Sequence, residues 1–164
     1  MKLSGEHLDT FEEQGFVVIE DYYPEEKRLA IINALRDTLP TWEDVKDNPP
    51  EGSRLIDDFP YANMFFNKLI LDMDLIDFAQ KALGTNDIHF RYAHNWVRYP
   101  NPAGPQQDLH IDNGNNSILP PSDDNRYGQI SSWYFPEEVG DDQAPMRIIP
   151  KPHGRNLSKK VLLT

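Results

Sequence analysis

The chain has 164 residues and a formal net charge of −11, from 16 Lys and Arg against 27 Asp and Glu. This length fits one domain and the negative charge repels phosphate backbones, so we expect a single domain that binds no nucleic acid. Because there is no cysteine, any metal must be held by His, Asp or Glu. Residues 1–11 lack the apolar core of an export signal, and no run is apolar enough for a membrane span, which predicts a cytoplasmic protein.

Helical patterns dominate the N-terminal part of the chain. Ser4 is placed to cap a short helix that Gly15 ends, and the β-branched run at 16–19 predicts a buried strand. Pro24 suits the first turn of a helix that should continue to about Leu39. The first 39 residues therefore predict a helix, a strand and a second helix.

The next segment combines a predicted loop with further helices. Residues 40–60 hold several prolines among many acids, which predicts one long loop. From about 63 to 83, the apolar residues recur at helical spacing, and Gly84 is placed to end one or two helices. These patterns predict a helical layer over about residues 1–84.

After Gly84 the pattern changes to the alternation that is typical of strands. Residues 88–99 predict one strand, and shorter strands are expected at 127–135 and 146–149. One face of the first strand would carry Ile88, Phe90, Tyr92, His94, Trp96 and Arg98. We therefore expect an α+β fold, with the helical layer leaning on a β-rich part at about 85–164.

The triplet His110-Ile111-Asp112 is the clearest chemical motif. Residues i and i+2 of an extended segment project from one face, so the imidazole and the carboxylate can bind one ion. They would supply two of the three ligands of the 2-His-1-carboxylate site of non-haem Fe(II) oxygenases. A turn-capping pair is the structural alternative, and chance produces about 0.5 such triplets in a chain of this composition. The context of the triplet must decide between these interpretations.

That context resembles the phytanoyl-CoA dioxygenase family. The segment Glu13–Ile19 after an opening helix, and Tyr23-Pro24-Glu25-Glu26 before a long helix, are similar to the N-terminal signature of the family. His110-Ile111-Asp112 lies where the family has its HxD iron pair, and Gln143–His153 resembles an NGPLRVIPGSH-like stretch. The resemblance spans about residues 4–154.

The resemblance implies an Fe(II)- and 2-oxoglutarate-dependent dioxygenase that uses O₂ to hydroxylate a small substrate. The implied fold is a double-stranded β-helix, a jelly-roll and cupin-like architecture. His110 and Asp112 would be the metal ligands, Trp96 and Trp133 would contact the cofactor, and His94, Ser131 and His153 would line the pocket. The strand faces that carry these side chains are also compatible with plain core packing.

Residues that the family uses further along are not found after His153. The resemblance places a third iron ligand, a His, and an Arg that binds 2-oxoglutarate some tens of residues beyond this segment. Residues 154–164 contain no His, and their single Arg, Arg155, is too close to match. We therefore expect an incomplete double-stranded β-helix, truncated at the C-terminus, that is inactive alone. A non-catalytic ligand-binding homologue and a cupin-like metal protein completed by His153 are the alternatives.

Overall fold

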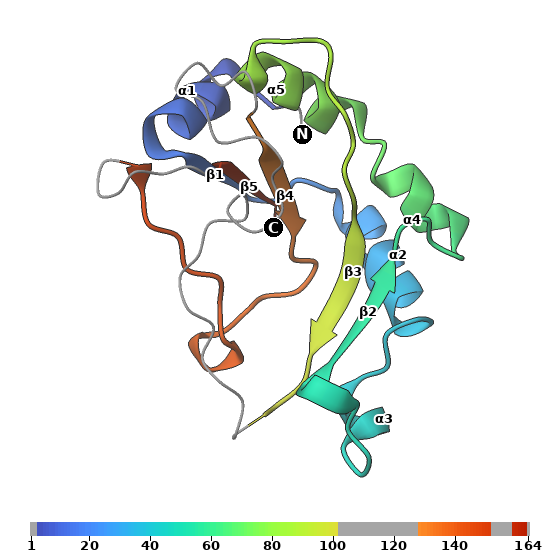
Figure 1. Ribbon diagram of the computed structural model, residues 1–164. Coiled ribbons are helices and arrows are strands. Elements are labelled where there is room, and N and C mark those ends of the chain that lie inside the picture. The colour runs from blue at the N-terminus through green and yellow to red at the C-terminus, as the bar shows by residue number, and fades with distance from the viewer. Residues whose placement is uncertain (1–2, 102–127, 152–158, 164) are drawn as a thin grey trace. The chain divides into compact units, whose positions relative to one another are not determined.

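The computed structural model describes residues 3–101, 128–151 and 159–163 (Figure 1). Contacts between Cα atoms group these residues into two compact units. The first unit comprises the described residues within 1–25, 73–88 and 108–164, and the second comprises those within 26–72 and 89–107. Each unit contains both helices and strands, which confirms the predicted α+β class.

In the first unit, helix α1 (Gly5–Gln14) begins and ends as its sequence predicts. The Ser4 hydroxyl accepts a hydrogen bond from the backbone N–H of His7, and the His7 ring bonds back to the Ser4 backbone. Gly15 takes the left-handed conformation, with φ of 78°, and its N–H donates to the Phe11 carbonyl at 2.9 Å. The chain can therefore turn directly into strand β1 (Phe16–Ile19).

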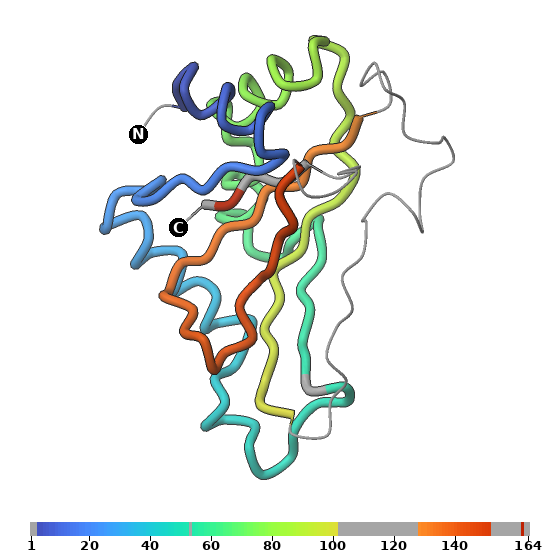
Figure 2. The backbone as a smooth tube through the Cα atoms, turned by 90° about the vertical axis from the view of Figure 1, so that its left-hand side faces the viewer, coloured from blue at the N-terminus to red at the C-terminus, as the bar shows by residue number. Residues whose placement is uncertain are grey.

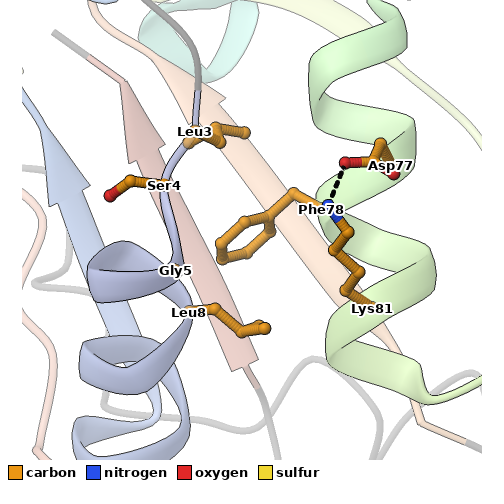
Figure 3. Close-up of a pocket in the computed structure, with 7 residues that line it drawn as sticks. All are labelled: Leu3, Ser4, Gly5, Leu8, Asp77, Phe78 and Lys81. Atoms are coloured by element: carbon orange, nitrogen blue, oxygen red, sulfur yellow. Dashed lines mark hydrogen bonds and ion pairs between the residues drawn. The ribbon is translucent and has the colours of Figure 1, made fainter.

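An aromatic contact joins α1 to helix α5 (Met73–Leu83) within this unit. Phe11 is fully buried and packs edge-to-face on Phe78 with the ring centroids 5.3 Å apart. Figure 3 shows a small pocket beside this contact, with Leu3 and Leu8 on the α1 side and the ring of Phe78 directed toward them from α5. An ion pair on α5 between Lys81 Nζ and Asp77 Oδ2, at 2.6 Å, lies at the same pocket.

The first unit also contains a three-stranded sheet in the order β1-β5-β4, whose strands are labelled in Figure 1; Figure 2 shows β1 in blue and β4 in orange from a second direction. Strand β5 (Lys159–Leu163) lies between β1 and β4 (Ile130–Tyr134) and pairs in parallel with both. A short 3₁₀ helix, η2 (Asp141–Gln143), follows β4. The ring of Tyr23 packs edge-to-face on the ring of Tyr134 in β4, with the ring centroids 5.1 Å apart.

The second unit contains α2 (Glu25–Arg36), whose first residue is grouped with the first unit, then α3 (Trp42–Val45), η1 (Glu51–Ser53), β2 (Arg54–Asp58), α4 (Met64–Leu69) and β3 (His94–Arg98). Strands β2 and β3 pair in an antiparallel ladder (Figure 1). Directly after β3, the buried Tyr99 hydroxyl donates a 2.5 Å hydrogen bond to the Pro40 carbonyl. Within α4, the Asn67 side chain donates to the Tyr61 carbonyl and accepts from the Tyr61 N–H.

Three sequence expectations about strands are wrong. The predicted loop at 40–60 contains α3 and β2, and the acidic, weakly apolar strand β2 forms because β3 pairs with it. The predicted strand at 146–149 has no regular structure, since Pro145 and Pro150 flank it and lack the N–H donors of a ladder. No strand was expected at 159–163, where β5 lies.

The strand predicted at 16–19 is confirmed with the same bounds, and two others are confirmed with shorter ones. The strand expected at 88–99 is restricted to β3, and the strand expected at 127–135 contains β4. The parallel pairings of β5 differ from the antiparallel sheet of a jelly roll, and the double-stranded β-helix stays a prediction. No described helix has the length and apolar character needed to cross a membrane.

We predict that Gly15→Ala destabilises the first unit by about 1 kcal/mol, because an alanine Cβ is strained in the left-handed conformation. Gly5→Ala is the matched control: Gly5 begins the same helix, and a Cβ there would meet no atom within 4 Å. That control should be neutral or slightly stabilising. Urea unfolding curves measure both, and equal losses in the two variants would contradict the prediction.

Candidate functional site

The residues that the sequence assigns to metal binding are not described by the structure. His110, Asp112 and His153 all lie outside the described residues. Among the residues that are described, no group of three His, Asp or Glu side chains could hold a metal ion. The metal site that the sequence predicts therefore stays a prediction. Its only support is that His110 and Asp112 are residue types that bind metals.

The other predicted site residues fall into two pairs, one on each of two strands. His94 and Trp96 share one face of β3 in the second unit, and Ser131 and Trp133 share one face of β4 in the first unit. All four side chains are partly buried. The predicted sharing of a face is confirmed for His94 and Trp96, while contact with a cofactor or a substrate stays a prediction for all four residues.

Alternate side chains from Tyr92, just before β3, to Arg98 at its end form a continuous stack. The Tyr92 ring lies parallel to His94, with the centroids 5.7 Å apart, and His94 packs edge-to-face on Trp96 at the same distance. The guanidinium carbon of Arg98 lies 4.7 Å from the centroid of the Trp96 ring, which is cation–π geometry. The alternation read from the sequence therefore places four interacting side chains in a row.

Strand β2 extends this surface, which we call the arginine face. It consists of three cross-strand pairs: Arg54 with Arg98, Ile56 with Trp96, and Asp58 with His94. Directly opposed residues of an antiparallel pair lie on the same side of the sheet. The arginine face therefore carries two guanidinium groups at one end, an apolar and aromatic pair in the middle, and an acid beside an imidazole at the other end.

The opposite face of β2 and β3 contains an unusual polar pair. Asp57 lies directly opposite Asn95 in the register. The Asp57 Oδ2 and Asn95 Nδ2 atoms are buried, and neither has a hydrogen-bond partner among the described residues. Burial of Tyr61, together with the charges of Asp57 and Asp58, raises the pKa of the Tyr61 phenol to about 12. The surroundings of Tyr61 therefore disfavour ionisation of its hydroxyl group.

Comparison with known families identifies the chain. The model of the phytanoyl-CoA dioxygenase family matches residues 11–162, which is nearly the whole sequence. The chain therefore belongs to the phytanoyl-CoA dioxygenase family. Neither the search of curated proteins nor the search of solved structures returns a significant match. Members of this family are generally Fe(II)- and 2-oxoglutarate-dependent, and the HxD triplet of the sequence lies within the matched residues.

Sequence reasoning missed the contribution of β2 to the arginine face. The signal was the alternation of Arg54, Ile56 and Asp58, but prolines and acids surround this short segment and favour a loop. Asp57 and Asn95 were also missed, because their pairing depends on the register of two strands that are far apart in the chain.

We predict that Asp57→Asn lowers the pKa of Tyr61 part of the way toward its ordinary value, since the larger of the two charge contributions is removed while burial remains. Alkaline titration of tyrosinate absorbance, with Tyr61→Phe used to assign the signal, measures this change. The control Asp47→Asn removes an exposed carboxylate that does not contribute to the shift. A curve that is unchanged in Asp57→Asn would contradict the assignment.

The raised pKa of Tyr61 makes the free energy of unfolding depend on pH in the alkaline range. A tyrosine with a higher pKa in the folded chain than in the unfolded chain stabilises the fold below about pH 10. This contribution, roughly 1 kcal/mol once solvation of the ring edge is allowed for, is lost as the pH rises toward about 12. Tyr61→Phe should therefore flatten the fall in unfolding free energy over that window, as measured by denaturant unfolding at several pH values.

Proposed function

We propose that the chain is part of an Fe(II)- and 2-oxoglutarate-dependent dioxygenase that hydroxylates a small molecule. The observation that carries the proposal is the family match over residues 11–162, together with the HxD triplet inside the matched region. Fold alone does not define an activity, so the donor residues must support it as well. An imidazole and a carboxylate are the ligand types that a non-haem Fe(II) site requires.

His110 and Asp112 are the proposed iron ligands. When bound, iron and 2-oxoglutarate supply the activation of O₂, and the protein supplies ligand geometry and a site that excludes water. The His110 imidazole must be neutral to bind a metal, and the Asp112 carboxylate must be ionised. The family-level chemistry therefore requires a protein environment that keeps one side chain uncharged and the other negative.

Strands β3 and β4 supply the proposed pocket residues. On β3, His94 is proposed as a pocket residue and Trp96 as a cofactor contact, and stacking with Tyr92 and Arg98 restrains their rings. On β4, Ser131 is proposed as a pocket residue and Trp133 as a cofactor contact, and His153 is proposed to shape the pocket. The preference for His153 as a pocket residue over a third ligand follows from the resemblance to the family's NGPLRVIPGSH-like stretch.

We predict that the 164-residue chain binds Mn(II), a surrogate for Fe(II), weakly, because His110 and Asp112 supply two of the usual three protein ligands. Asp112→Ala should abolish this binding in titration calorimetry. Asp47→Ala is the control, since it removes an exposed carboxylate of the second unit. Unchanged Mn(II) binding in Asp112→Ala, or equal loss in both variants, would exclude His110 and Asp112 as the site.

A second prediction concerns turnover by the same 164 residues. Succinate should not form above background with Fe(II), 2-oxoglutarate and O₂, because residues 154–164 supply neither the distal His nor the Arg of the family pattern. Loss of a bidentate contact to the 2-oxoglutarate carboxylate alone removes a few kcal/mol of binding free energy. Succinate formation that a His153→Ala variant abolishes would contradict this prediction and favour a site completed by His153.

A further inference from the structure

Three aromatic rings of the second unit meet where β2 ends, and we call them the aromatic cluster: Phe59, Tyr61 and Phe90. The Phe59 ring packs edge-to-face on Phe90, with the centroids 5.2 Å apart, and on Tyr61, with the centroids 6.1 Å apart. Phe59 is 41% exposed and Phe90 is 54% exposed, whereas Tyr61 is buried. The cluster therefore presents two phenyl rings to solvent.

Backbone and side-chain contacts hold this cluster in place. The Phe59 N–H donates to the Ala93 carbonyl at 2.9 Å, one residue beyond the β2–β3 ladder. The Asn67 amide accepts from the Tyr61 N–H at 2.9 Å and donates to the Tyr61 carbonyl at 2.7 Å, and the Tyr61 ring packs on the buried Phe66. A ligand that binds here therefore has little ordering of the protein to offset.

Two carboxylates make the surroundings of the cluster negative. Asp57 and Asp58 directly precede Phe59 in the chain. The Oδ2 atom of Asp57 is buried without a hydrogen-bond partner among the described residues, and the Asp58 side chain is exposed. Both charges act on Tyr61, since each raises the pKa of its hydroxyl. A cation against the cluster would be attracted by these charges, and an anion would be repelled.

A neighbouring ring shows that aromatic residues of this segment contact cations. The guanidinium carbon of Arg91 lies 5.4 Å from the centroid of the Tyr92 ring, which is cation–π geometry. Among the residues that the structure describes, no cationic side chain lies over Phe59 or Phe90. These two exposed rings can therefore receive a cation from outside the chain.

We propose that the aromatic cluster binds a small organic cation, an ammonium group that carries alkyl substituents. The alkyl groups cover the exposed parts of Phe59 and Phe90, and the positive charge lies close to the two carboxylates. Alkyl substituents favour such a ligand over a bare metal ion, because they add apolar burial against the rings. The site is independent of the proposed iron chemistry, since it uses neither of the proposed iron ligands.

The test is an NMR titration of the 164-residue chain with choline as the probe, followed by the aromatic signals of the protein. The neutral isostere 3,3-dimethylbutan-1-ol has the same shape without the charge. Choline should bind about tenfold more tightly, because the ring faces and the carboxylates attract the charge. Added NaCl should reduce this difference by screening the carboxylates. Equal binding of choline and 3,3-dimethylbutan-1-ol would overturn the proposal.

Two variants remove the ring faces but keep an apolar side chain. Phe59→Leu and Phe90→Leu should each weaken choline binding by about threefold and leave the binding of 3,3-dimethylbutan-1-ol nearly unchanged. Phe16→Leu is the control, since this partly buried phenylalanine lies on β1 of the first unit. Thermal melts verify that each variant is folded. Unchanged choline binding in both Phe59→Leu and Phe90→Leu would count against the site and overturn the proposal.

A third variant tests the role of the negative charge. Asp58→Asn should weaken choline binding by about threefold at low salt, because it removes an exposed carboxylate beside the cluster. Asp47→Asn removes an exposed carboxylate elsewhere in the second unit and should have no effect. Equal losses in these two variants would mean that the net charge of the chain attracts choline, and this result, like an unchanged affinity in Asp58→Asn, would overturn the proposal.

Discussion

The antiparallel register of β2 and β3 determines which side chains of the second unit can act together. It places Arg54 opposite Arg98 and Ile56 opposite Trp96, while Asp57 and Asn95 meet on the other side. A shift of one residue would move every side chain of a strand to the opposite face. The hydrogen bond from Tyr99 to the Pro40 carbonyl anchors the chain directly after β3, so it opposes such a shift at the arginine end of the ladder.

The two faces of this strand pair differ in how their polar groups are accommodated. On the arginine face, the side chains of Arg54, Arg98 and Asp58 are exposed to solvent. On the other face, buried atoms of Asp57 and Asn95 have no hydrogen-bond partner among the described residues, which costs about 1–3 kcal/mol for each group. The polar side chains of the arginine face therefore remain in contact with solvent, whereas polar atoms on the other face are buried.

Local patterns predicted the elements whose signals lie within a few residues. The Ser4 cap and the Gly15 end define α1, and the alternation from Tyr92 to Arg98 correctly placed His94 and Trp96 on one face. The same reasoning failed for β2, because its acids and few apolar residues favour a loop until β3 is present to pair with it. Flanking prolines likewise prevented the apolar run at 146–149 from forming a strand.

The candidate site also contains some features that local sequence predicts and others that depend on the pairing of distant segments. The HxD triplet and the family match could be read from the sequence alone, since a metal motif depends on the spacing of His110 and Asp112. The arginine face could not, since Arg54 and Arg98 meet only through the pairing of distant segments. A strand read in isolation shows what its face carries, but it does not show which strand will complete that face.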